Sequence, residues 1–100
     1  MVELIHEHVV HVRTPNGSAY VPRTYGERKT DGMWEGWLEF DPVSGNGSKL
    51  RTDRETSQAT REALEVWSSG LESVYFEGAF ARARVISPSS PRARRSRRAG

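Results

Sequence analysis

Two histidines near the start of the chain have the spacing of metal ligands. His6 and His8 lie two residues apart in a predicted strand, so both imidazoles project from one face, as a metal site requires. The other ligands would have to come from His11, which faces the opposite side, or from distant carboxylates. A solvated strand face or an imidazole packed at a sheet edge is the simpler interpretation, and we predict no metal and no other cofactor.

A row of carboxylates surrounds a tryptophan in the segment MWEGWLEFD. Glu35, Trp37, Glu39 and Asp41 alternate along a predicted strand and share one face at steps of about 6.8 Å. Carboxylates so spaced can serve glycoside hydrolysis, but these lie on one strand, and an antiparallel sheet normally shows water a polar face. The favoured functional interpretation is a docking face for a cationic or aromatic partner, with Trp37 as its anchor. The simpler interpretation, which we place first, is that a second helix covers Trp37.

Further polar residues gather where a helix is predicted to begin. Arg54, Gln58 and Arg61 lie in its first turns, and a helix N-terminus with nearby cations attracts phosphate or carboxylate groups. Against this, capping explains Glu55, a neighbouring carboxylate can pair with Arg54, and no glycine-rich phosphate loop precedes the helix. We therefore favour a structural role here over a ligand site.

The basic character of the chain belongs to its last nine residues. The whole chain has 15 Lys and Arg against 13 Asp and Glu, a formal charge of +2 and a pI near 9.4. Without the five tail arginines, ten basic side chains remain against thirteen acidic ones. Because it has no aromatic side chain for base stacking, the tail would bind nucleic acid without regard to sequence; a solubilising extension is the simpler interpretation. The tail arginines are Arg92, Arg94, Arg95, Arg97 and Arg98.

Four predicted strands would position these residues. Hydrophobic alternation and β-branched residues predict strands at residues 2–13, 19–28, 33–41 and 49–52, with turns at residues 15–18 and at Asp31-Gly32. Pro22 indicates an edge position or a bulge in the second strand, because proline donates no ladder hydrogen bond.

A helix is predicted to follow the last strand. Thr52-Asp53-Arg54-Glu55 has the spacing of a capping box, and Gly70 suits a left-handed C-cap. Residues 73–84 fit a helix or a strand, and their alanine content favours a second short helix although Gly78 weakens it. The apolar face of the first helix would comprise Ala59, Ala63, Leu64, Val66 and Trp67.

These elements predict an α+β fold, with a three- to four-stranded antiparallel sheet packed by one helix and a second short one. Residues 1–86 would form one small domain. Residues 87–100, rich in Ser, Pro and Arg, would form a disordered basic tail. The predicted core comprises Trp34, Leu38, Phe40, Leu64, Trp67 and Phe76.

Composition excludes several classes of protein. The mean hydropathy of −0.71 argues against a membrane span, and the absence of Cys excludes disulfides, thiolate metal sites and a cysteine nucleophile. No catalytic triad, nucleotide-binding motif or cofactor fingerprint is recognisable. We therefore expect a cytoplasmic protein that is not an enzyme.

Three motifs resemble those of a known family. Residues 34–40 read WEGWLEF and residues 54–58 read RETSQ, while residues 75–83 read YFEGAFARA. This pattern, W-x-G-W-x-E-F, R-E-T-x-Q and Y-x-E-G-A-x-x-R-A, resembles a family of small bacterial proteins with no known activity. The resemblance spans residues 20–84 and implies a domain extent but no chemistry.

We therefore predict a small interaction module that binds a protein partner, or a second copy of itself, through the sheet face around Trp37 or the start of the helix. The alternative is an accessory protein that binds nucleic acid weakly through the tail.

The tail hypothesis predicts where any nucleic-acid affinity resides. A chain ending at Ser87 should lose nearly all the DNA and RNA affinity of the full chain, because the remaining residues carry an excess of acidic side chains. Fluorescence anisotropy at two salt concentrations measures this, and binding by the full chain should fall steeply as salt rises. Equal binding by the truncated chain would refute the hypothesis.

Overall fold

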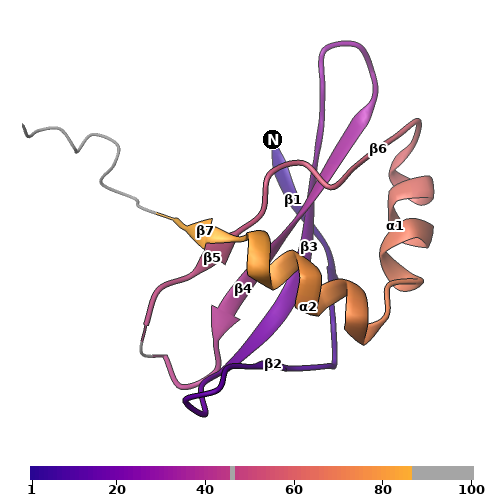
Figure 1. The fold of residues 1–100 in the computed structure, drawn as a ribbon. Helices are drawn as coiled ribbons and strands as arrows, with labels where there is room; N and C mark the ends of the chain where they lie inside the picture. The colour runs from indigo at the N-terminus through magenta and orange to yellow at the C-terminus, as the bar shows by residue number, and fades with distance from the viewer. Residues whose placement is uncertain (46, 87–100) are drawn as a thin grey trace, which may run out of the picture.

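An antiparallel sheet and two helices make up residues 1–45 and 47–86, the part of the chain that the computed structural model describes (Figure 1). The predicted α+β class is confirmed, but the sheet has seven strands among these residues rather than three or four. The predicted tail, residues 87–100, lies outside them. The elements are β1 (Val2–Glu7), β2 (Val12–Arg13), β3 (Ala19–Arg28), β4 (Trp34–Pro42), β5 (Leu50–Arg51), β6 (Thr56–Gln58), α1 (Arg61–Ser69), α2 (Ser73–Arg82) and β7 (Arg84–Val85).

The sheet is larger than predicted because its outer strands are broken into short pieces. The strand order is β1-β3-β4-β5-β7, and β2 also pairs with β3 while β6 pairs with β4. The predicted strand at residues 2–13 is thus two strands on the same neighbour. Residues 56–58, expected to be helical, add a further strand, and β7 extends the sheet beyond β5.

Pro22 lies in β3, which is a central strand and not an edge. The carbonyl of Pro22 accepts a hydrogen bond from the His8 amide at 3.1 Å, so this side of the residue faces the break between β1 and β2. A backbone N–H at residue 22 would point the same way as this carbonyl, toward the break between β1 and β2. Its absence therefore costs no hydrogen bond between paired strands. The irregularity that proline predicts is therefore in the neighbouring strand, which is interrupted between Glu7 and Val12, beside Pro22.

The first helix begins later than its predicted cap. α1 starts at Arg61, and the Thr60 hydroxyl accepts the cap hydrogen bond from the Ala63 amide at 3.0 Å. The capping box at residues 52–55 is wrong because the buried Thr52 hydroxyl accepts a hydrogen bond from the Leu38 amide instead. That bond holds the segment against β4, and β6 follows it.

The helix ends also differ from expectation. Gly70 caps α1 with φ −92°, so the left-handed C-cap is wrong. Val66, assigned to the apolar face, is 73% exposed. Residues 73–82 form α2, which resolves the ambiguity of this segment in favour of the helix.

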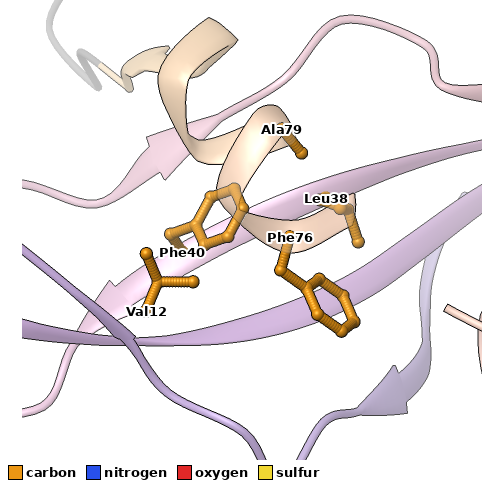
Figure 2. Close-up of a cluster of buried hydrophobic side chains, with 5 residues drawn as sticks. All are labelled: Val12, Leu38, Phe40, Phe76 and Ala79. Atoms are coloured by element: carbon orange, nitrogen blue, oxygen red, sulfur yellow. The ribbon is translucent and has the colours of Figure 1, made fainter. Parts of the chain in front are cut away.

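Both helices pack against the same face of the sheet, and the core lies between them and β4 (Figure 1). Figure 2 shows Phe76 and Ala79 of α2 in one cluster with Leu38 and Phe40 of β4. Four predicted core residues are confirmed as buried, whereas Trp34 and Trp67 are only half-buried. The four are Leu38, Phe40, Leu64 and Phe76.

A pair of glycines lets α1 approach the sheet closely. Gly26 and Gly36 are directly opposite each other in β3 and β4, and Leu64 of α1 lies above both. A β-carbon would lie 2.5 Å from Leu64 Cδ2 at Gly26, and 2.6 Å from Leu64 Cδ1 at Gly36. Leu64 is fully buried, so a larger residue at either position would push the helix outward.

We expect Gly36→Ala to destabilise the fold by about 1–3 kcal/mol, because the added methyl overlaps Leu64 in a filled site. Urea unfolding measures the change. Gly78→Ala in α2 is the matched control, because its β-carbon would meet nothing closer than 3.5 Å, and we expect it to stabilise by about 0.5–1 kcal/mol. A neutral or stabilising effect of Gly36→Ala would contradict the close approach.

Candidate functional site: the uncovered face of the sheet

The acidic stripe lies on the sheet face opposite the helices. Leu38 and Phe40 of β4 face the helices, so the alternating residues of the strand point the other way. Glu35, Trp37, Glu39 and Asp41 therefore share the uncovered face, as predicted.

Trp37 is buried on this face without help from a helix. Its side chain is only 4% exposed, and the guanidinium carbon of Arg51 lies 4.3 Å from the centre of its ring. Its indole N–H donates to Glu39 Oε2 at 3.0 Å. The prediction that a second helix covers Trp37 is wrong, because α2 packs over Leu38 and Phe40 instead. A cation from β5 covers the ring.

The carboxylates of the stripe are paired with basic side chains. Glu35 lies 3.8 Å from Lys29 Nζ and 3.5 Å from Arg54 Nη1. Lys49 Nζ lies 3.5 Å from Asp41 Oδ1 and 4.0 Å from Glu39 Oε1. The Asp41 contact is ionic only, since Oδ1 has no hydrogen bond of good geometry, while the other Asp41 oxygen contacts Arg23. The stripe is therefore close to electrically neutral.

Strand register arranges charged residues in a line across this face, which we call the charge row: Glu7, Arg23, Glu39, Arg51 and Arg84. Each is directly opposite the next on the neighbouring strand. The signs alternate from Glu7 to Arg51, and cross-strand pairs of opposite charge stabilise a sheet. The alternation ends with two arginines side by side.

The three residues predicted at the start of the first helix do not form one site. Arg54 lies before β6 and pairs with Glu35, while Gln58 ends β6 and donates to Thr56 Oγ1 at 2.7 Å. Arg61 is the first residue of α1, and its Nε donates to Glu3 Oε1 at 2.9 Å. Each has a structural partner of its own, and the three point to different neighbours.

A buried polar cluster joins the first strand to the first helix, and sequence reasoning missed it. His8 Nε2 lies 2.8 Å from Thr24 Oγ1, and the Ser68 hydroxyl donates to the same oxygen at 2.7 Å. Thr24 and Ser68 are essentially inaccessible, so these groups satisfy one another inside the core and none can reach a substrate. The available signal was helical spacing, since Ser68 lies four residues after Leu64 on the same helix face.

Burial and the nearby His6 lower the pKa of His8 to about 4. The two imidazole centres are 4.6 Å apart. Among residues 1–45 and 47–86, no group of three or more His, Asp or Glu side chains is placed to hold a metal ion. His8 instead packs against Phe76, with ring centres 4.5 Å apart.

A second missed cluster ties α2 to the loop before β6. Glu55 accepts hydrogen bonds from the Tyr75 hydroxyl and from Arg82 Nη2. Burial and the Glu55 carboxylate raise the pKa of Tyr75 to about 12, so this phenol stays protonated at neutral pH. Glu55, predicted to cap α1, thus stabilises the position of α2.

No helix in the described part of the chain is long and apolar enough to cross a bilayer.

The pKa of His8 predicts a pH dependence of stability. Because its folded-state pKa lies below the ordinary 6.5, His8 contributes stability above pH 6.5 that is lost as the pH falls towards about 4. Between pH 6.5 and pH 4 the unfolding free energy of the wild type should fall by up to about 3 kcal/mol more than that of His8→Gln. Urea titrations across this pH range measure the difference.

The matched control is His11→Gln, because His11 is exposed. It should follow the wild-type pH dependence. If His8→Gln followed it too, His8 would not be buried in its neutral form.

Comparison with known proteins places the chain in no group: no protein-family model, no curated protein and no solved structure matches it. The resemblance carried by residues 34–40, 54–58 and 75–83 therefore stays a prediction, and any functional assignment depends on the geometry above.

Proposed function

We propose that this chain is a non-enzymatic binding module that docks a protein partner on the uncovered sheet face, over Arg51 and Trp37. The observation that carries this proposal is the one-sided packing of the helices, which leaves a sheet face with its own ordered charges and a cation over a buried tryptophan. Such a surface offers a partner fixed charges at defined spacing, which gives specificity more than raw affinity.

The ion pairs of the acidic stripe narrow the chemistry of the partner that this face can bind. Because the carboxylates of the stripe already have cationic neighbours, a purely cationic partner gains little there. Trp37 is buried beneath Arg51, so a partner would contact the Arg51 side chain and not the indole ring. Val2 and Leu4, each about half exposed, add apolar contact area along the edge strand β1.

The internal clusters support the non-enzymatic part of the proposal. The only buried imidazole among the described residues bonds to Thr24 and lies beside Ser68, and the phenol of Tyr75 bonds to Glu55. These groups connect secondary-structure elements, and His8, Thr24 and Ser68 are buried away from solvent.

Nucleic-acid binding through the tail stays the alternative. It rests on five arginines that lie outside the described residues, whereas the remaining chain has more acidic than basic side chains. The sheet face therefore favours a protein partner over a polyanion.

Site-specific photo-crosslinking in cells tests the docking face. The exposed Ser57 lies directly opposite Glu35 in the sheet, so a photoreactive residue there probes the uncovered face. The exposed Glu77 of α2 is the matched control. We expect a defined partner to be captured from Ser57 and not from Glu77. The purified partner should then bind the purified full chain and crosslink again at Ser57.

Capture only from Glu77 would contradict the proposal, as would a partner that fails to bind when purified. Capture of a second copy of this chain would replace the proposed partner with self-association.

A further inference from the structure

An open hollow of about 210 Å³ lies where β5 and β7 pair, at the end of the charge row. Side chains from both strands line it, together with the residues that follow each of them. In the strand order β7 comes last, so among the described residues no strand lies beyond it. The lining residues are Arg51, Thr52, Asp53, Arg84, Val85 and Ile86.

Two arginines without a carboxylate partner face this hollow. Arg51 and Arg84 are directly opposite each other, and like charges in that arrangement destabilise a sheet. Within residues 1–45 and 47–86 neither guanidinium forms an ion pair; Arg51 contacts the ring of Trp37, and the exposed Arg84 side chain makes no hydrogen bond. The most basic point of the sheet is therefore left without a counter-charge.

The nearest carboxylates do not neutralise this point. Glu39 is directly opposite Arg51, but it accepts the Trp37 indole N–H and lies near Lys49. Asp53 lines the hollow without pairing with either arginine. Two guanidiniums and one carboxylate give the hollow a local charge of about +1.

We infer that this hollow binds the carboxylate of an acidic segment of the protein partner, which continues the alternation of the charge row by one more negative charge. The inference rests on the proposed docking function and names the chemistry of the partner. Guanidinium groups bind carboxylates through paired, charge-assisted hydrogen bonds, and Arg51 is already oriented by the ring below it. Val85 and Ile86 offer apolar contact to the methylene groups of a Glu or Asp side chain.

A carboxylate fits this hollow better than a nucleic-acid backbone does. A polyanion needs a track of several cations, whereas the charge row presents two arginines and then a glutamate. A single negative charge matches the local charge of the hollow.

The test titrates the isotope-labelled full chain with a short peptide that has blocked termini and a single glutamate, and follows backbone amide shifts by NMR. We expect the amides of Arg51, Asp53 and Arg84 to shift together. Arg84→Gln should weaken binding roughly two- to fivefold, in line with one exposed ion pair. Arg28→Gln, which removes another exposed arginine without an ion pair, is the matched control and should leave the affinity unchanged.

Asp53→Asn gives a second readout of opposite sign. Because it removes the only carboxylate that lines the hollow, it should tighten peptide binding about two- to fivefold. A purely structural role of Arg84 would not produce this gain.

Three outcomes would overturn the inference: peptide shifts confined to residues 87–100, equal losses from Arg84→Gln and Arg28→Gln, or stronger shifts of the hollow amides by an RNA oligonucleotide than by the peptide. Its failure is distinguishable from failure of the docking proposal. If the peptide causes no shifts at the hollow but a photoreactive residue at position 57 still captures a partner, the docking proposal holds and the inferred acidic segment is wrong. If the peptide binds and Ser57 captures nothing, the docking proposal fails.

Discussion

The close contact of Leu64 with the glycine pair Gly26 and Gly36 is the constraint on which the rest of the structure depends. With no side chain at either position, α1 lies directly on the sheet, and the short connection through Gly70 and Leu71 leads α2 onto the same face. The apolar side chains of β4 are buried by this one layer. Within the described part of the chain no second layer covers the opposite face, so the stability of that face depends on its own side chains.

On this second face, charged side chains provide the stabilising contacts. Arg51 covers the ring of Trp37, Glu39 accepts the indole N–H, and lysines and arginines from neighbouring strands pair with the acidic stripe. Exposed ion pairs contribute little individually, about 0–1 kcal/mol each. The buried tryptophan is satisfied without a helix above it by the Glu39 acceptor and the Arg51 guanidinium. The arrangement leaves two arginines side by side at the end of the charge row, and the proposed binding of an acidic segment depends on this excess of positive charge.

Sequence patterns predicted the features that follow from local periodicity. Alternation along residues 34–41 assigned both faces of β4 correctly, and the segment at residues 73–82 is a helix, as favoured. The failures have tertiary causes. The capping box failed because Thr52 bonds to Leu38 in a strand far away in sequence, and the cover over Trp37 was missed because Arg51 reaches it only through pairing of β4 with β5. The same holds for the His8 cluster, whose members come from three separate segments.

Two contacts define the two faces of the sheet: Leu64 of α1 lies on the glycine pair, and a cation covers Trp37 on the other side. Proton–proton contacts measured by NMR on the full chain can detect both. We expect contacts between the Leu64 methyl groups and the α-protons of Gly26 and Gly36, and between the Trp37 indole and the Arg51 side chain. Contacts from the Trp37 indole to Phe76 or Ala79 of α2 would contradict this arrangement.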